Sequence, residues 1–352
     1  MSIVNITRSG ALAVIGAAVL GVAVFSPPWA APAAAEIDSF AILTPEQGTD
    51  FGWNQQAVDA AQAVSERLGV EVIVASGLGY GDVRPTLREL AAEGADLLIA
   101  HASGYNSAAP EIAEETGVPV AIVDAPQAMQ EGLVADYTLS GHQGAYLAGV
   151  LAARMTRSGT LGIVVSGEPP AWNSQSAGFA QGARATDPEI ELRYSVIGPA
   201  AYADAAGARR VTEAVIAAGA DVIFGQGNGS SFGMLQAVET TDALDGGKVW
   251  FIDIIGDKSS IDNGHLLSSV LWNLEPVYSA MLQDLQDGTF GTAGYQIRLE
   301  DDSLQLLQSE HIPEEIWKDV TDVREEIIAG DIEVEALFDA QAVRDLMTAI
   351  AE

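Results

Sequence analysis

The sequence alternates short, almost wholly apolar runs with longer alanine-rich segments, and this alternation restricts the fold more than any other feature. Apolar runs such as SFAILT, VPVAIVDA and DVIFGQ have the length of buried strands. The segments between them, such as AVDAAQAVSERLG, repeat their apolar residues at the 3.6-residue period of a helix. Buried strands separated by helices are typical of parallel sheets built from βαβ units. We therefore predict an α/β fold with parallel sheets.

The two halves of the chain also resemble each other. GADLLIA at 94–100 matches GADVIFG at 219–225, which lies 125 residues later. A Trp-Asn pair at 53–54 matches another at 172–173, which lies 119 residues later. A nearly constant offset of this size predicts two lobes with one topology, and not a solenoid of short repeats.

The chain opens with a segment that is typical of export. Arg8 precedes the apolar run GALAVIGAAVLGVAVF, and the three alanines at 33–35 fit a cleavage site before Glu36. We predict a signal peptide over residues 1–35. A membrane anchor is the alternative, but the run is about four residues shorter than the ~20 that a comfortable span needs.

Charge and cysteine content narrow the class of protein further. The net charge is −33 and the chain contains no cysteine. Without disulfides, the roughly 317 residues after the signal must form large apolar cores, and this length suits two lobes. An acidic surface repels phosphate backbones, so we expect no nucleic-acid partner. The acids are spread along the chain, which we attribute to solubility.

The Trp-Asn pair occurs three times, at 53–54, 172–173 and 272–273, where chance predicts roughly 0.1 such pairs. The first two pairs follow the first strand of each half and open a helix, which is where open parallel sheets bind ligands. An indole offers a flat stacking face, and an Asn amide both donates and accepts hydrogen bonds. We hypothesise that Trp53 and Trp172 grip a planar heterocycle; packing of each indole against its own strand is the alternative.

A catalytic motif competes with this hypothesis. GSSFG at 229–233 fits G-x-S-x-G, with Ser231 as nucleophile and His265 further along in hydrolase order. The motif arrives late for a plain hydrolase, and no HGG-type segment for an oxyanion hole is visible. We therefore predict that the protein is not an enzyme. The four histidines lack metal-ligand spacing, and we expect neither a metal nor a cofactor.

Several motifs in a fixed order point to a known family. DFGWNQQA, HQGAYLAGVLAARMT, GADVIFGQGNGSSFGMLQAVE and LLSSVLWNLEPVYSAMLQDLQDG occur in this order, and the chain resembles the basic membrane protein (BMP) family of ABC-transporter substrate-binding proteins. The resemblance runs from about Asp38 to Gly330. It implies a type I periplasmic-binding fold, with two Rossmann-like lobes that a three-segment hinge closes on a ligand. The implied lobes are an N-terminal lobe of 36–125 plus 273–292 and a C-terminal lobe of 126–272 plus 293–352.

The resemblance also implies a function. It makes the chain the extracytoplasmic solute-binding component of an ABC importer, with a membrane permease as its partner. Family members characterised for their ligand bind purine nucleosides or related bases, so the expected ligand is a small planar heterocycle, a purine nucleoside or base. We expect a monomer that is free in the periplasm, because a chain without cysteine cannot carry the N-terminal lipid of many members. A ligand sensor that uses the same cleft stays an alternative.

Finally, the resemblance assigns site residues. Asp124, at the first crossover, would bond ligand hydroxyls, and Phe232 would be a second stacking ring. In the loop FIDIIGDKS, Asp257 would hold the second family acid, while Ile255 replaces the first and Asp253 stands upstream. Where many members read SVVKR this chain reads SVLWN, so a cation is lost and a Trp-Asn pair gained. The residues expected to bind ligand are Asp50, Phe51, Trp53, Asn54, His101, Ser103, Tyr105, Asp124, Trp172, Asn173, Asn228, Phe232, Asp253, Asp257, Trp272 and Asn273.

Overall fold

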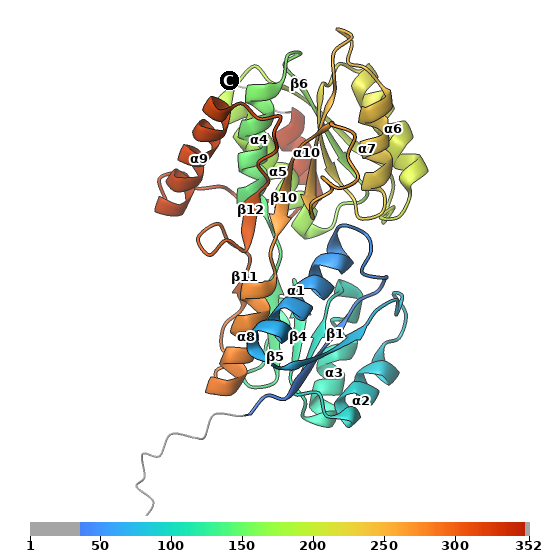
Figure 1. Ribbon diagram of the computed structural model, residues 1–352, viewed down its shortest axis with the longest axis vertical. Helices are drawn as coiled ribbons and strands as arrows, with labels where there is room; N and C mark the ends of the chain where they lie inside the picture. The colour runs from blue at the N-terminus through green and yellow to red at the C-terminus, as the bar shows by residue number, and fades with distance from the viewer. Residues whose placement is uncertain (1–35, 349–352) are drawn as a thin grey trace, which may run out of the picture. The chain divides into compact units, whose positions relative to one another are not determined.

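The computed structural model describes residues 36–348 (Figure 1). The expected signal peptide over 1–35 lies outside the described residues, as does 349–352. The described part forms two six-stranded sheets with helices packed on them, which confirms the predicted α/β fold. None of its helices is long and apolar enough to cross a membrane.

The first sheet has the strand order β11-β5-β4-β3-β1-β2, and every neighbouring pair in it is parallel. Its strands are β1 (Ser39–Leu43), β2 (Glu71–Ala75), β3 (Leu97–Ala100), β4 (Val120–Val123), β5 (Val134–Thr138) and β11 (Tyr295–Gln296). The helices that pack with it are α1 (Trp53–Leu68), α2 (Arg84–Glu93), α3 (Ala108–Thr116) and α8 (Glu275–Asp287), and η1 (Ser103–Tyr105) and η2 (Pro126–Ala128) are short 3₁₀ turns.

The second sheet has the order β12-β10-β9-β8-β6-β7, and only its edge strand β12 runs antiparallel. Its strands are β6 (Thr160–Val165), β7 (Glu191–Val196), β8 (Val222–Gln226), β9 (Trp250–Ile255), β10 (Leu266–Trp272) and β12 (Leu304–Leu306). The helices of this half are α4 (His142–Met155), α5 (Pro170–Thr186), α6 (Ala205–Ala217), α7 (Ser231–Thr240), α9 (Glu314–Ala329) and α10 (Ala340–Thr348).

The two halves share one strand order, as the internal repeat predicted. The run β5-β4-β3-β1-β2 in the first sheet corresponds strand for strand to β10-β9-β8-β6-β7 in the second. In each half the first strand therefore lies between the second and the third, so the loops after the first and third strands are neighbours at the carboxyl edge of the sheet. Such an edge is where open α/β sheets bind ligands.

The first sheet extends further along the chain than the expected lobe boundaries. We placed the first crossover at 125, but β5 pairs with β4 in the same sheet. We placed the return to the second lobe at 292, but β11 pairs with β5 beyond that point. Neither VADYT nor the two-residue YQ carries the apolar run that marks a buried strand in sequence. How the remaining segments divide between lobes stays a prediction.

Glycines let two helices of the second half approach closely. A Cβ on Gly149 of α4 would lie 2.1 Å from the carbonyl oxygen of Phe179, and one on Gly182 of α5 would lie 2.0 Å from that of Tyr146. Only glycine fits at such backbone contacts. The close crossing fixes α5, whose first turns stand at the carboxyl edge of the second sheet.

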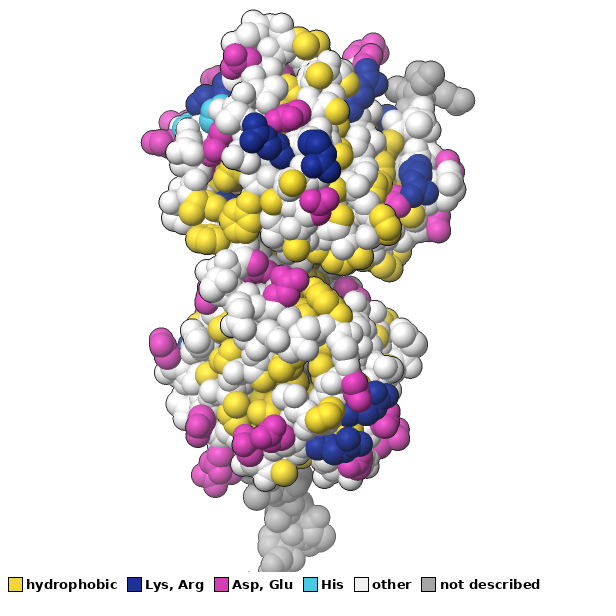
Figure 2. All heavy atoms as spheres, turned by 90° about the vertical axis from the view of Figure 1, so that its right-hand side faces the viewer, with side chains coloured by type: hydrophobic (Ala, Val, Ile, Leu, Met, Phe, Trp, Pro, Cys, Tyr) yellow, Lys and Arg dark blue, Asp and Glu magenta, His cyan; other side chains and the backbone are white. Residues whose placement is uncertain are grey.

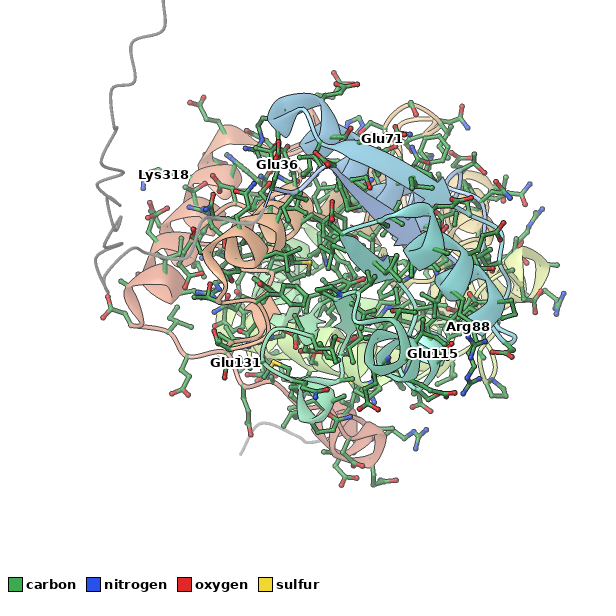
Figure 3. The ribbon with its side chains drawn as sticks, turned by 90° about the horizontal axis from the view of Figure 1, so that it is seen from below. Glu36, Glu71, Arg88, Glu115, Glu131 and Lys318 are labelled. Atoms are coloured by element: carbon green, nitrogen blue, oxygen red, sulfur yellow. The ribbon has the colours of Figure 1, made fainter. Side chains whose placement is uncertain are left out.

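The surface charge is scattered. Acidic side chains are distributed over the face shown in Figure 2 and do not gather in one patch. Some acids are paired: Figure 3 shows Arg88 beside Glu115, and their side chains form an exposed ion pair with a separation of 2.7 Å. Exposed pairs of this kind contribute about 1 kcal/mol or less to stability, so the fold depends chiefly on its apolar cores.

Candidate functional site

Buried side-chain atoms that lack hydrogen-bond partners gather at the carboxyl edge of the second sheet. Each residue concerned has a buried side-chain nitrogen or oxygen with no partner among residues 36–348. These residues lie just after β6 or β8, at the last residue of β8 or β10, within β9, or on the first turns of α5: Ser166, Gln175, Gln226, Asn228, Ser230, Asp253 and Trp272. In Asp253 the oxygen without a partner is Oδ1, because Oδ2 pairs with Lys258. In the described part of the first half, only Asn106 has such an atom.

This concentration has a physical meaning. A buried polar atom without a partner costs about 1–3 kcal/mol, and folded proteins tolerate only a few of them. Two of these residues have a fixed polarity, because the Asp253 carboxylate only accepts when ionised and the Trp272 indole nitrogen only donates. The hydroxyl and amide groups can serve either way once they are reoriented. The edge is therefore suited to a bound molecule that both donates and accepts hydrogen bonds.

The equivalent edge of the first sheet is different, because its polar groups bond to one another. The Asp50 carboxylate accepts from the backbone amides of Gly52, Asn54 and Gln55 at 3.1, 3.1 and 2.9 Å, and from Asn54 Nδ2 at 2.8 Å. Asn54 is fully buried, and its Oδ1 accepts from the Glu46 amide at 3.3 Å. Asp50 therefore caps the start of α1, where a carboxylate also complements the helix dipole. Both polar atoms of the Asn54 side chain already have a partner.

Trp53 is half-buried and is held by His101. Its indole Nε1 donates to the His101 carbonyl at 3.0 Å, and the Trp53 carbonyl lies 3.1 Å from His101 Nε2. The imidazole Nδ1 lies 2.8 Å from the Tyr137 hydroxyl, so both ring nitrogens are engaged. Burial lowers the pKa of His101 to about 3, which keeps the ring neutral. His101 thus holds Trp53 in place through these hydrogen bonds. The contact of His101 with a ligand that the sequence suggested stays a prediction.

Of the remaining candidate ligand-binding residues of the first half, one is buried in the core and two are exposed. Tyr105 is buried, and its hydroxyl donates to the Gly79 carbonyl at 2.6 Å, so it belongs to the core. Ser103 is exposed in η1. Asp124 is exposed, and its Oδ1 accepts from the Leu139 amide at 2.9 Å, which leaves Oδ2 without a partner among the described residues. Desolvation by the surrounding protein raises the pKa of Asp124 to about 6, with a smaller contribution from the Asp136 carboxylate, while the Leu139 amide opposes this shift.

The second Trp-Asn pair is a packing element. Trp172 is 4% exposed, and its ring meets the edge of Tyr202 with the centroids 5.3 Å apart. Asn173 Nδ2 donates to the carbonyls of Glu168 and Phe338 at 3.1 and 2.9 Å, which ties the C-terminal segment to α5. Within residues 36–348, no aromatic contact joins Trp172 to Trp53. The placement therefore does not support the expected sandwich of these two indoles.

The third pair supplies the indole that meets Trp53. The rings of Trp53 and Trp272 lie edge to face with centroids 6.0 Å apart. Trp272 is 1% exposed, and a Cβ on Gly141 would lie 3.0 Å from its Nε1 and 3.1 Å from Gln175 Oε1. These two atoms without partners therefore approach the same point at the start of α4. Asn273 has a local role, because its Oδ1 accepts from the Glu275 amide at 3.1 Å and caps α8.

A buried lysine links the loop after β9 to the loop before α1. Lys258 Nζ donates to the Phe51 carbonyl at 3.1 Å and forms an ion pair with Asp253. The same nitrogen lies 5.7 Å from the centroid of the Phe232 ring, whose edge meets Phe51 at 6.3 Å. Burial raises the pKa of Asp253 above its ordinary value, and the Lys258 charge opposes that shift. The contact is tight, since a Cβ on Gly256 would lie 2.1 Å from the Phe51 carbonyl oxygen.

Sequence reasoning missed Lys258, as well as Ser166, Gln175, Gln226 and Ser230. We counted the cation of the family as lost from the SVLWN strand, but a lysine on the neighbouring loop is buried at this edge. One pattern in the sequence could have indicated Lys258: it is one of only three lysines, and it follows the strand residue Asp253 by five positions.

The two neighbouring candidates have local roles. Asp257 is exposed and accepts from the backbone amide and the hydroxyl of Ser259 at 2.8 and 2.5 Å. Ser231 is buried, and its hydroxyl donates to the Asn228 carbonyl at 2.7 Å, a geometry that does not present a nucleophile. Within the described residues, no three His, Cys, Asp or Glu side chains are grouped so that they could hold a metal.

Two six-stranded sheets of one strand order, each packed with helices, define an α/β fold of two similar halves. Solved structures share this fold. The solute-binding protein of an ABC transporter system from Conexibacter woesei DSM 14684 has a TM-score of 0.71 at 20% identity, covering 86% of this chain and 100% of that one. One from Aeropyrum pernix K1 has a TM-score of 0.73 at 19% identity, covering 88% and 97%.

The chain belongs to the family of PnrA-like ABC transporter substrate-binding proteins, whose family model matches residues 37–337. This confirms the resemblance to the BMP family and makes the chain a binding protein, not a hydrolase. Among curated relatives, the nucleoside-binding protein BmpA of Lactococcus lactis subsp. cremoris is 23% identical over 168 residues, or 45% of this chain and 47% of that protein. A purine-binding protein of Brucella abortus is 22% identical over 293 residues, or 80% and 79%.

Proposed function

We propose that this protein is the extracytoplasmic solute-binding component of an ABC importer, and that it binds a purine nucleoside or base between its two lobes. Two relatives support the ligand class, since their names describe a nucleoside-binding and a purine-binding protein. A membrane permease would accept the ligand from the closed protein. The acidic surface and the absence of cysteine fit export as a free periplasmic protein.

The observation that carries this proposal is the set of buried polar atoms without partners at the carboxyl edge of the second sheet. A purine has both donors and acceptors around its rim, so it can satisfy Asp253 Oδ1, the carboxylate oxygen that does not pair with Lys258, and the indole donor of Trp272 as well as adaptable amides such as Asn228. Few apolar metabolites of that size could do so, because each unpaired group would keep its cost of about 1–3 kcal/mol.

The flat surface for the ring is Trp53. Trp53 is half-buried and makes two hydrogen bonds with His101: its indole nitrogen bonds to the His101 carbonyl, and its own carbonyl bonds to the His101 ring. The orientation of the indole is therefore fixed before a ligand arrives. Preorganised side chains lose little freedom on binding, which raises affinity. Phe51 and Phe232 lie at the adjacent loop contact and can supply the second face. Asp124, with one free carboxylate oxygen, is the candidate partner of sugar hydroxyls.

The proposal is tested by a thermal-shift screen followed by calorimetric titration. Adenosine, guanosine and their free bases are the probes, and glucose is the control without a planar ring. A ligand that binds only the folded state raises the melting temperature. If none of the purines shifts melting or releases heat, the ligand assignment is wrong.

A variant pair then tests the stacking surface. Trp53→Ala should weaken purine binding by roughly ten- to a hundredfold, because stacking of a base on an aromatic side chain is worth ~1–3 kcal/mol in single-stranded nucleic-acid binders. Trp317→Ala, on the half-exposed face of α9, is the control and should leave affinity unchanged. Equal affinities of the two variants would remove Trp53 from the site.

A further inference from the structure

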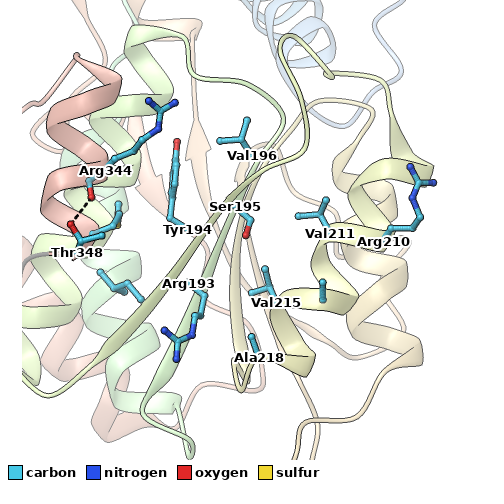
Figure 4. A pocket seen from close by; sticks show the side chains of 13 residues that line it. Arg193, Tyr194, Ser195, Val196, Arg210, Val211, Val215, Ala218, Arg344 and Thr348 are labelled. Carbon is cyan, nitrogen blue, oxygen red and sulfur yellow. Dashed lines mark hydrogen bonds between the residues drawn. The ribbon is translucent and has the colours of Figure 1, made fainter.

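A groove of about 730 Å³ lies on the second half of the molecule, away from the site described above (Figure 4). Its floor is β7, and its two walls are α6 and α10. Figure 4 shows the strand between the two helices, with Tyr194 and Arg344 on one side and Val211 and Arg210 on the other. The groove shares no lining residue with the set of polar atoms at the carboxyl edge.

The floor of the groove is the open edge of a sheet. Within residues 36–348, β7 is the last strand of the second sheet and pairs only with β6. The Glu191 amide donates to the Gly159 carbonyl and the Ile197 amide to the Val165 carbonyl, so the odd-numbered residues face β6. In a parallel ladder, alternate residues turn their amide and carbonyl groups to opposite sides. The main-chain groups of Leu192, Tyr194 and Val196 therefore point into the groove.

The side chains of both faces of β7 line the groove as well. Leu192 and Val196 lie on the face covered by α5 and α10, whereas Arg193 and Ser195 lie on the face covered by α6. A groove can contact both faces of one strand only where it runs along the edge of that strand. An added strand would place its alternate side chains against the α6 wall and the α10 wall, which is the geometry of β-augmentation.

The charge of the groove is opposite to that of the protein. Its lining contains three arginines and no Asp or Glu, in a chain with 16 basic and 49 acidic residues. Arg193 pairs with Glu191 at 2.6 Å, and Arg344 pairs with Glu168. Arg210 is exposed and forms no ion pair within residues 36–348. An occupant with acidic side chains would complement this groove, and a basic one would be repelled.

We propose that the edge of β7 binds an extended acidic segment of a partner protein, which adds to the second sheet as a further strand. The main-chain groups of Leu192, Tyr194 and Val196 would provide the ladder. Arg210, which has no ion pair within residues 36–348, would select for acidic side chains. With the acids on the α6 side, beside Arg193 and Arg210, the apolar positions between them would rest against Met347 of α10. The five residues of this edge accommodate a strand of about 16 Å.

The test uses the full mature chain and a fluorescein-labelled hexapeptide that alternates Glu and Val, measured by fluorescence anisotropy. Binding is expected at low salt, with weaker binding as salt screens the arginines. Arg210→Ala should weaken it by about two- to fivefold, as expected for an exposed charge pair. Arg209→Ala removes the same charge one residue away, outside the groove, and should not change it. Equal effects of the two variants would overturn the proposal.

Two further peptides separate strand addition from plain charge attraction. A peptide with the same side chains but alternate N-methylated amides loses the donors for the ladder and should bind at least about tenfold more weakly. A Lys-Val peptide should not bind. Equal binding of the N-methylated peptide, or binding of the Lys-Val peptide, would overturn the proposal. Self-association of the protein that Arg210→Ala abolishes would do so too, because it would assign the groove to a second copy.

The purine titration serves as the internal control. Because the groove lies apart from the Trp53 site, Arg210→Ala should bind purines as tightly as the unaltered chain. A preserved purine affinity also shows that the variant is folded.

Discussion

The carboxyl edges of the two sheets have the same topology but opposite states of hydrogen bonding. At the first edge, Asp50 satisfies Asn54 and the amides of α1, and His101 joins Trp53 to Tyr137. At the second edge, Asn228, Ser230 and their neighbours have buried atoms without partners in the described residues. The polar groups of the first edge are bonded to one another and hold the Trp53 indole in a fixed position. In the proposed function, a ligand would pair with the buried atoms of the second edge.

Equivalent positions of a duplicated topology therefore need not have the same role. A polar group that is already bonded contributes to stability, whereas one that is buried and unpaired lowers stability and raises affinity for whatever satisfies it. Substitutions at the first edge should therefore change folding, and those at the second edge should change binding. The Asp253–Lys258 ion pair is the exception, because it is buried at the second edge and yet paired.

The largest effect is expected at that exception. Asp253→Ala should destabilise the fold by about 3–5 kcal/mol, because it leaves the Lys258 ammonium buried without its counter-charge. The double variant Asp253→Leu with Lys258→Met removes both charges and should recover most of that loss. Urea denaturation of the three proteins measures both values. A loss below about 1 kcal/mol in Asp253→Ala would show that the pair is solvated and not buried.

A pH effect of intermediate size is expected from His101. Burial places its folded pKa at about 3, below the ordinary value of 6.5, so its contribution to stability is complete above pH 6.5 and is lost as pH falls toward 3. Between pH 6.5 and 5 this loss amounts to about 2 kcal/mol. Urea denaturation at pH 7, 6 and 5 should show the slope, and His101→Gln should flatten it. The half-buried His311→Gln is the control and should keep the slope.

Two asparagines test the contrast between the edges directly. Asn54→Ala should cost about 1–3 kcal/mol of stability, because Asp50 and the Glu46 amide lose a buried partner. Asn228→Ala should change stability little and weaken purine binding by about tenfold, or ~1.4 kcal/mol. Calorimetry and thermal melting of both variants check this pair. If Asn228→Ala melts early and binds normally, the contrast between the edges fails.

The smallest effect concerns Asp124, whose pKa is about 6 in the folded protein. Because this pKa is raised, the neutral acid is the form that folding favours, and a small part of stability is lost as pH rises from about 4 to 6. A carboxylate that accepts from sugar hydroxyls acts in its ionised form. Nucleoside affinity should therefore rise by at most about tenfold from pH 5 to 7. Titrations of the nucleoside and its free base compare the two, and a rise of equal size for both would exclude the sugar contact.

The fold could be read from the sequence to a large extent. The apolar runs of β1, β4 and β8 and the 3.6-residue periods between them reflect the local geometry of strands and helices, so they are visible in any short window. The duplicated strand order followed from the repeat of GAD segments 125 residues apart. β5 was not predicted because its VADYT sequence contains polar residues, which the fold pairs: Asp136 Oδ1 accepts from the Ala125 amide at 2.5 Å, and Oδ2 accepts from Thr138 Oγ1 at 3.0 Å.

The candidate site could be read only in part. The sequence located the carboxyl ends of the strands. Asn228 lies in the loop after β8, Trp53 opens the helix after β1, and Asp253 lies within β9. The three Trp-Asn pairs are identical in sequence, but their tryptophans differ in environment. Trp53 is half-buried, Trp172 packs against Tyr202, and the indole nitrogen of Trp272 has no hydrogen-bond partner among the described residues. Which neighbours a side chain meets depends on elements more than a hundred residues away, as in the 207-residue separation of Lys258 from Phe51. Periodicity determined the architecture because it is local. Which polar side chains find hydrogen-bond partners depends on residues far apart in the sequence. The difference between the two edges therefore becomes visible only in the tertiary structure.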